Sequence, residues 1–384
     1  YKQFYPNTLM ETGIDILYQW VSRMLCMGVY ITGKLPFENV YLHGMVRSED
    51  GRKMSKSLGN VISPHGVIEE YGSDALRMGI ISGRSAGDSS AYAPAKVIAG
   101  RNFANKLWNV ARFVEGILED KPGKPEVKPV TSADHWMLSR LQQTIETASG
   151  HMNNYRLSEA YETVYHFVWD DFADWYVEAS KHEINPGLLR YGLGAILKLS
   201  HPFAPFVTET IWQTLDWTGE SLLMSEEWPK AESYDDKQVQ TFEDIRTIVV
   251  ETRAIKTTLQ LKQTSLYFSG VAFLRDHAEM LKGLAKIDGV HEVEAGHGLH
   301  LTSTPHNCWL DVDRETTQHY VIKLQKQLQE AENKHEGYHK RLDNKSYIKQ
   351  APKQLVDDTK AQLAETEQLI TNIRTQITRF SSPE

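Results

Sequence analysis

The residues best suited to chemistry form a short loop, residues 51–60, which reads Gly-Arg-Lys-Met-Ser-Lys-Ser-Leu-Gly-Asn. Its glycines permit a mobile loop. Lys53 and Lys56 can present two ammonium groups to one polyphosphate, and Ser55 and Ser57 can donate hydrogen bonds. Such a loop can clamp a departing pyrophosphate, because lysines that close during the reaction stabilise the developing negative charge. The alternative is an exposed turn rich in lysine and serine.

The composition is that of a globular protein with roughly two or three domains. Of the 384 residues, 41% are hydrophobic and 24% are charged. The longest apolar stretch, residues 17–31, is interrupted by polar side chains and does not reach the roughly 20 apolar residues of a membrane span. Cys26 and Cys308 cannot form a disulfide framework or a four-cysteine zinc site, which favours a reducing, cytoplasmic setting. The chain begins at Tyr1 without a secretory signal, and we expect this start to be a cut.

The formal net charge of -8 argues against a uniformly basic protein that binds nucleic acid, but the charge is segregated. Lysine and arginine slightly outnumber aspartate and glutamate in residues 1–120 and 314–384. The whole negative excess therefore lies between these segments. We expect a polyanion to bind mainly to the two terminal segments and to local basic patches.

The elements that must position the loop belong to an α/β layer. Residues 39–46 are expected to form a strand that leaves the core, with the phosphate loop after it. The pattern then predicts a helix from residue 95 to about 119 and a proline-rich linker at 121–129.

Residues 131–260 have the periodicity of a helical bundle. Thr131 stands three residues before Asp134, which resembles a capping box, and apolar residues then recur at steps of three and four. A further apolar helix is expected at 189–199, before two prolines.

The C-terminal part is expected to hold a small α/β module at 264–312, followed by two long helices. Apolar residues step by three and four through 321–342 and again through 356–380, as in a heptad seam. A loop with Asn344 and Pro352 separates the two runs, so we predict an antiparallel coiled coil. The alternative is an intermolecular zipper, which proline loops rarely interrupt.

Residues 53–57 match the second signature of the class I aminoacyl-tRNA synthetases without a mismatch. Other segments resemble the valyl branch of the valine, isoleucine and leucine subgroup, in the right order and at the right spacings. These segments are 12–16, Trp20, 43–46 and 101–109. The similarity covers the whole chain, because valyl enzymes end in a helical anticodon-binding domain and a coiled-coil arm. The terminal heptads and the lack of cysteine-rich zinc ligands weigh against the isoleucyl branch.

The resemblance implies that Mg²⁺-bound ATP and valine are substrates and that the first domain is part of a Rossmann-type nucleotide-binding fold. Asp15 would accept hydrogen bonds from the ribose of ATP, although it also suits a helix N-terminus. Lys56, helped by Lys53, would hold the phosphates. The residues beside the adenine would be His43, Gly44 and Val46.

Ile16 and Trp20 lie four residues apart and would share one helical face. The resemblance assigns them to one wall of a small apolar pocket for the valine side chain. The pattern alone favours the hydrophobic core instead.

For RNA, the resemblance assigns Lys106, Arg112 and Phe113 to the anticodon site, where cations contact phosphates and an aromatic ring stacks on a splayed base. The pattern alone would place Phe113 in the core. The basic residues of the coiled-coil arm would contact the tRNA elbow, among them Lys323, Lys326, Lys340, Arg341, Lys345 and Lys349. We interpret Asp170, Asp171 and Asp174 as a solvated helix face, and predict no protein-bound metal.

The His-x-Gly-His signature of class I enzymes does not occur in the sequence. We therefore expect the chain to lack half of the adenylation site and the editing domain, and to be inactive alone. The resemblance implies a monomeric full-length valine–tRNA ligase with tRNA(Val) as partner and no membrane. The open alternatives are the isoleucyl or leucyl branch and a non-catalytic tRNA-binding protein. The expected domains are the catalytic half at 1–94, a helical connection and linker at 95–130, the anticodon-binding domain at 131–262, the module at 263–313 and the arm at 314–384.

Overall fold

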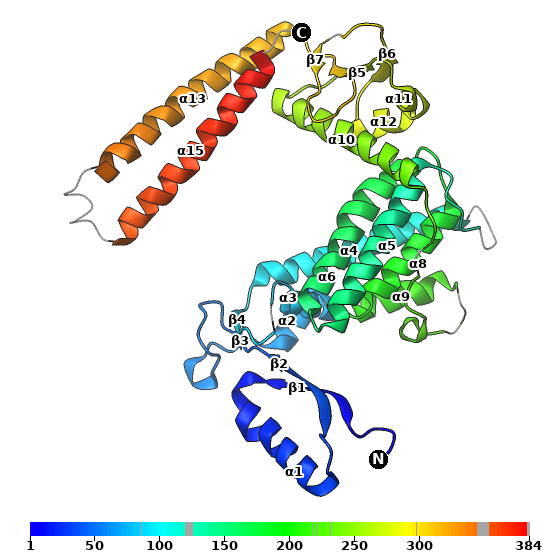
Figure 1. Cartoon of the computed structure of the whole chain (residues 1–384), viewed down its shortest axis with the longest axis vertical. Coiled ribbons are helices and arrows are strands. Elements are labelled where there is room, and N and C mark those ends of the chain that lie inside the picture. Colours follow the sequence, from blue (N-terminus) through cyan, green and yellow to red (C-terminus); the bar gives the residue numbers. More distant parts are fainter. Residues whose placement is uncertain are drawn as a thin grey trace. The chain divides into compact units, whose positions relative to one another are not determined.

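Figure 1 shows a computed structural model of the chain. It describes residues 1–384 except 85, 120–125, 218, 220, 231, 297, 344–352 and 382–384. The protein is mostly helical with small sheets, and it divides into two compact units, Tyr1–Gln240 and Thr241–Glu384. In the described residues, no helix is long and apolar enough to cross a membrane. Most of the expected linker, and the whole loop between the two C-terminal helices, lies outside the described residues.

The first unit begins with a β–α–β arrangement. Strand β1 (Asn7–Gly13) pairs in parallel with β2 (Phe37–His43), so that Gly13 lies opposite His43. Helix α1 (Ser22–Thr32) lies between these strands in the sequence. A 3₁₀ turn (Ile14–Ile16) and a π-helical turn (Leu17–Val21) precede α1. The carboxyl ends of the two strands therefore meet at one edge.

The strand expected at 39–46 is interrupted at Gly44. Strand β2 ends at His43, and β3 (Val46–Arg47) pairs in parallel with β4 (Ser90–Ala91). A Cβ atom on Gly44 would lie only 1.8 Å from the carbonyl oxygen of Asp88. The prediction of one continuous strand is wrong because the backbone at Asp88 crosses this point, and a strand running on would need room for a side chain there.

The segment after the loop folds as three packed helices, α2 (Pro64–Tyr71), α3 (Ser73–Ile81) and α4 (Pro94–Glu119). The bounds of α4 confirm the helix expected at 95–119. Val67, Ala75 and Val97 form a buried cluster between them. Gly100 allows α4 to approach α3 closely, since a Cβ there would lie 2.9 Å from the carbonyl oxygen of Ala75.

The helical bundle follows, and the buried carboxylate of Asp74 joins α3 to it by hydrogen bonds. Its elements are α5 (Ser132–Asn153), α6 (Leu157–His166), a π-helical segment (Phe167–Tyr176), α7 (Val177–Ser180), α8 (Pro186–Ser200), α9 (Pro205–Leu215) and a 3₁₀ turn (Leu223–Ser225). Asp74 on α3 accepts hydrogen bonds from the backbone N–H groups of Phe206 (3.2 Å) and Val207 (2.7 Å). It thus caps the N-terminus of α9, where no local side chain does so.

The start of α5 is the predicted capping box. The Thr131 hydroxyl accepts from the backbone N–H of Asp134, and the Asp134 carboxylate accepts from the backbone N–H of Thr131. The same carboxylate, 1% exposed as a residue, also accepts from Val130, Asn185 and the Tyr176 hydroxyl. Burial, together with the Asp134 charge, raises the pKa of Tyr176 well above its ordinary value. Asp134 therefore joins α5, α8 and the π-helical segment.

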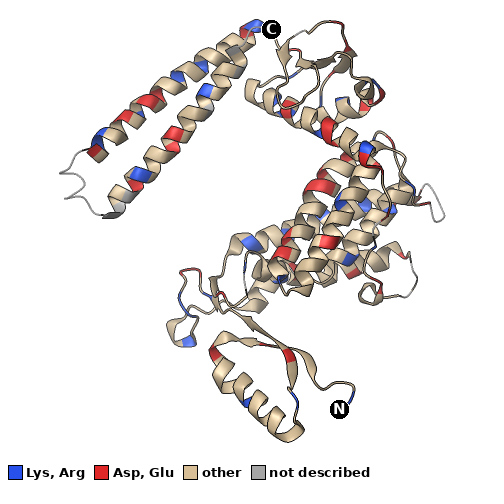
Figure 2. Ribbon diagram, in the orientation of Figure 1, with Lys and Arg blue, Asp and Glu red and all other residues tan. Residues whose placement is uncertain are grey.

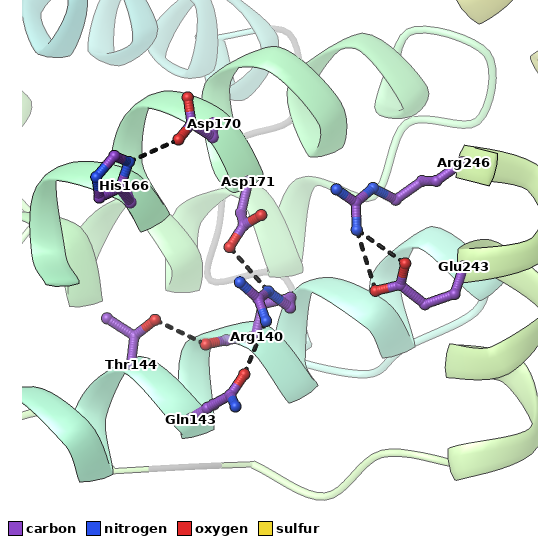
Figure 3. A network of polar contacts seen from close by, with 8 residues as sticks. All are labelled: Arg140, Gln143, Thr144, His166, Asp170, Asp171, Glu243 and Arg246. Carbon is purple, nitrogen blue, oxygen red and sulfur yellow. Dashed lines mark hydrogen bonds and ion pairs between the residues drawn. The ribbon is translucent and has the colours of Figure 1, made fainter. Parts of the chain in front are cut away.

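The interpretation of the three aspartates as one solvated face is wrong for Asp171. Asp171 is buried, and its Oδ2 lies 2.8 Å from Nε of Arg140 on α5 (Figure 3). Asp170 is exposed and lies 2.8 Å from the ring of His166, as the same figure shows. Asp171 lies three residues after buried Val168 and four before buried Trp175, so it shares their inward side of the segment.

The second unit holds most of α10 (Asp236–Leu259) and a sheet with strand order β6-β5-β8-β7. The strands are β5 (Ser265–Phe268), β6 (Gly289–Glu292), β7 (Leu299–His300) and β8 (Cys308–Leu310), and the helices are α11 (Ala272–Asp276) and α12 (Ala278–Ala285). The buried carboxylate of Glu251 on α10 accepts hydrogen bonds from the backbone N–H groups of Thr302 and Ser303. This contact joins the segment between β7 and β8 to α10.

The chain ends with α13 (Arg314–Asp343) and α15 (Lys353–Ser381), which run antiparallel and pack together. Tyr320 contacts Gln376, and His335 contacts Glu367, at 2.8 and 3.2 Å. The residues of the predicted seam are the buried or half-buried ones, with Leu324, Ala331 and Ile373 in a core cluster.

Candidate functional site

In the predicted phosphate loop, residues 51–60, hydrogen bonds with Asn60 fix the backbone while the two lysine side chains stay exposed. Asn60 accepts a hydrogen bond from the backbone N–H of Ser55 (2.9 Å) and donates to the carbonyl of Lys53 (3.2 Å). The hydroxyls of Ser55 and Ser57 lie 2.7 Å apart. The side chains of Lys53 and Lys56 are exposed, and neither ammonium group has an acid partner among the described residues. Both charges are therefore available to a polyphosphate.

A second ordered turn precedes the loop. Asp50 accepts hydrogen bonds from the Ser48 hydroxyl (2.6 Å) and from Arg52, and these bonds lower the pKa of Asp50 to about 2. Asn60 also donates to the Ser48 hydroxyl (3.1 Å). The anchoring role of Asn60 was not predicted from the sequence, although an Asn after Gly59, whose φ is +65°, is typical of a turn.

The carboxyl ends of β1 and β2 bring Asp15 and His43 together. A Cβ on Gly13 would lie 2.7 Å from Oδ1 of Asp15 and 3.6 Å from Cε1 of His43. His43 Nε2 lies 3.4 Å from the carboxylate of Glu11, and its Nδ1 lies 3.0 Å from the carbonyl of Gly44. Asp15 also stands in the first turn of a 3₁₀ helix, as its alternative interpretation required. The contact of Glu11 with His43 was not predicted from the sequence.

His43, Gly44 and Val46 line one cavity of about 490 Å³, which reaches α3 and the bundle. Arg84 also lines it, with a buried Nε that has no hydrogen-bond partner in the described chain. Burial lowers the pKa of Arg84. No pattern in the sequence singles out this residue, because its position depends on the contact between α3 and α6.

Ile16 and Trp20 do not share a regular helical face. Ile16 ends the 3₁₀ turn and Trp20 lies in the π-helical turn, and α1 begins only at Ser22. Their exposed fractions are 37% and 52%, so the interpretation of both as core residues is wrong. Both exposed apolar side chains are open to a ligand or a further segment.

The predicted anticodon residues lie along α4. Nζ of Lys106 lies 2.6 Å from Asp174 and 5.2 Å from the ring centroid of Trp169, so this cation is already engaged. Arg112 is exposed and has no partner among the described residues. Phe113 is half-buried rather than part of the core, with Nζ of Lys181 5.8 Å from its ring centroid.

The helical pair carries both signs of charge along its length (Figure 2). Lys323, Lys326 and Arg341 are exposed, whereas Lys340 pairs with Glu336 at 2.5 Å. Lys345 and Lys349 lie outside the described residues. Among the described residues, no three His, Cys, Asp or Glu side chains cluster in a way that could hold a metal ion.

Family models match three successive parts of the chain. Residues 1–91 match the class I tRNA synthetases for isoleucine, leucine, methionine and valine, and residues 134–266 match the anticodon-binding domain of tRNA ligases. Residues 311–381 match the tRNA-binding arm of valyl-tRNA synthetases. The chain belongs to the valyl branch of the class I aminoacyl-tRNA synthetases. The match of residues 311–381 to the valyl arm weighs against the isoleucyl and leucyl alternatives.

Similar curated proteins are valine–tRNA ligases. Those of Thermotoga maritima and Bacillus subtilis are each 34% identical, over 94% and 93% of this chain and 44% of their own lengths. That of Staphylococcus epidermidis is 42% identical over 66% of this chain and 30% of its own. The chain thus spans less than half the length of these relatives.

A solved structure shares the fold. The leucyl-tRNA synthetase of Agrobacterium radiobacter K84, in a ternary complex with tRNA, superposes with a TM-score of 0.52 at 19% identity. The superposition covers 69% of this chain and 30% of that one.

Proposed function

We propose that the complete protein is a valine–tRNA ligase, which activates valine with Mg²⁺-bound ATP and transfers it to tRNA(Val). The match of residues 311–381 to the valyl tRNA-binding arm carries this proposal, because it separates the valyl branch from its relatives. This chain would supply the phosphate clamp and the tRNA-binding parts. We place the protein in the cytoplasm as a monomer.

In the proposed activation step, a carboxylate oxygen of valine attacks the α-phosphorus of ATP. The bond from that phosphorus to the bridging oxygen breaks, and pyrophosphate leaves with the electron pair. Lys53 and Lys56 would close on the pyrophosphate, with Ser55 and Ser57 donating hydrogen bonds. Their exposed ammonium groups, which have no acid partner among the residues that the structure describes, support this role on a loop anchored by Asn60, since charge developing in the transition state is what they would bind.

The strand ends would hold the nucleoside. Asp15 would accept hydrogen bonds from the ribose hydroxyls, and His43, Gly44 and Val46 would lie against the adenine. The closeness of Asp15 and His43 across Gly13 supports this arrangement. The backbone of Asp88, rather than a base, occupies the near side of Gly44, so adenine would approach from the cavity that His43 and Val46 line. Ile16 and Trp20 would form one wall of the valine pocket.

We divide the chain functionally as a catalytic half at 1–94, a connection at 95–130, an anticodon-binding bundle at 131–262, a module at 263–313 and a coiled-coil arm at 314–384. Arg112 and Phe113 would meet the anticodon loop, and Lys106 would do so by exchanging Asp174 for a phosphate. The seam buried between α13 and α15 supports the coiled coil. The exposed cations of this pair would meet the tRNA elbow.

The decisive experiment is amino-acid-dependent exchange of pyrophosphate into ATP by the full-length gene product. Valine should support the exchange and isoleucine or leucine should not. Exchange that depends on isoleucine would assign the protein to another branch. The 384-residue chain alone should bind tRNA in a salt-sensitive way and make no adenylate, so adenylate formed by this chain would contradict the division of the active site.

A further inference from the structure

A cavity of about 410 Å³ lies in the helical bundle, lined by none of the predicted site residues. Its floor is a face of α8 on which Gly187 and Gly194 carry no side chain. Its aromatic walls are Trp212 on α9, Trp217 just after α9, and Trp228. A volume of this size suits a ligand such as a single nucleotide.

Arg190 on α8 gives the cavity its charge. The guanidinium carbon lies 4.8 Å from the ring centroid of Trp217, so the indole holds it in place. The guanidinium has no hydrogen bond or ion pair with any residue in the described part of the chain. Burial lowers the pKa of Arg190. A half-buried arginine without an anion has free N–H donors, which can form two parallel hydrogen bonds to a phosphate or a carboxylate.

The other cations of the cavity are already satisfied. Lys198 lies 3.3 Å from Glu226, and Lys230 lies 2.7 Å from Glu227. The remaining acid in the lining, Glu232, is exposed. Burial and the charge of Glu232 together raise the pKa of Tyr191 to about 12. The anion-binding capacity of the cavity is thus concentrated on Arg190.

The walls of the cavity are fixed before any ligand arrives. The indole N–H of Trp228 donates to the Ser149 hydroxyl (3.0 Å), and that of Trp212 donates to the carbonyl of Ser221 (3.2 Å). The Tyr191 hydroxyl donates to the carbonyl of Lys230. Trp228 nevertheless remains 38% exposed, so a planar ring can reach its face. Preformed walls lower the entropic cost of binding.

We propose that this cavity binds one nucleotide of a single-stranded RNA segment, with its phosphate on Arg190 and its base stacked on the indole wall. Aromatic rings beside an arginine suit a nucleotide better than a peptide carboxylate, because each base offers a face for stacking. The proposal rests on the proposed function only in taking RNA as the partner. It adds a contact on α8 and α9 to those expected along α4.

The test uses the 384-residue chain labelled with 5-fluorotryptophan and followed by fluorine NMR, with signals assigned by substitution. The probes are pentauridylate, uridine, inorganic phosphate and pentaglutamate. Pentauridylate should shift the Trp217 and Trp228 signals saturably, while uridine and phosphate alone bind at least about tenfold more weakly. The signal of Trp136, which is 0% exposed in α5, reports that the bundle stays folded.

The variant Arg190→Gln should weaken pentauridylate binding by about tenfold or more, and Arg190→Lys by less. The matched control is Arg156→Gln, which removes an exposed arginine paired with Glu159 and should change nothing. The proposal would be overturned if the fluorine signals of Trp217 and Trp228 in the folded chain did not shift when pentauridylate is added. It would also be overturned if Arg190→Gln bound pentauridylate as tightly as the unchanged chain. Binding of pentaglutamate in place of pentauridylate would overturn it in favour of a protein partner. The exchange assay on the full-length protein is independent, so the two failures are distinguishable.

Discussion

Replacing Asp134 by alanine should destabilise the helical bundle by about 3–5 kcal/mol. The carboxylate accepts four hydrogen bonds, from the backbone of Val130 and Thr131, from the Asn185 amide and from the Tyr176 hydroxyl, at 2.8–3.1 Å. Loss of the cap costs about 1 kcal/mol. Tyr176 is 0% exposed, so leaving its hydroxyl without a hydrogen-bond acceptor costs about 1–3 kcal/mol. The remaining donors lie nearer the surface and add less.

Urea unfolding measured at the bundle alone provides the assay. The chain has two compact units, so a global signal would mix transitions, whereas the fluorine signal of 5-fluorotryptophan at Trp136 reports the bundle. Tyr176→Phe should cost about 1 kcal/mol, because the carboxylate keeps its other donors. Asp170→Ala removes an exposed partner of His166 and should cost less than about 0.5 kcal/mol. A loss below about 1 kcal/mol for Asp134→Ala would refute the reasoning.

Three further outcomes follow from the site and the small module. In the full-length protein, Lys56→Ala should lower kcat for pyrophosphate exchange by about 10²–10³ while the KM for valine changes little; a rise in KM alone would contradict the clamp. Phe113→Leu should raise the Kd of the chain for tRNA(Val) about tenfold in a filter-binding assay, and an unchanged Kd would remove its stacking role. Burial raises the pKa of Cys308 from 9.0 to about 12, so the module should lose stability as the pH rises through this interval. Iodoacetamide at pH 8 should therefore modify exposed Cys26 and spare Cys308, and equal rates would refute this.

Features set by local sequence were predictable. The capping box at Thr131 and Asp134 was found because both partners lie within one turn. Helix α4 ends just before a proline-rich segment, which is a clear signal in the sequence. The apolar pattern of α13 and α15 repeats over many residues, so single exceptions do not hide it. The loop at 51–60 was recognisable for the same reason, since its glycines, lysines and serines are contiguous.

Features set by distant contacts were not predictable. Asp74 caps a helix that begins about 130 residues later, and Gly44 is required by the backbone of Asp88. Asp171 is buried beside Arg140, which comes from a separate helix and provides the opposite charge. Arg84 and Arg190 acquire their surroundings only when separate helices pack. Both arginines line cavities, so the sequence could predict the candidate sites only in part.

The central claim is most directly tested by exchange of pyrophosphate into ATP with the full-length gene product, assayed with valine, isoleucine and leucine in parallel. Exchange that requires valine, and that Lys56→Ala reduces by about 10²–10³, is the predicted result. Exchange that requires isoleucine or leucine, or a full-length protein that exchanges with none of the three, would contradict the assignment of this chain's phosphate loop and tRNA-binding parts to a valine–tRNA ligase.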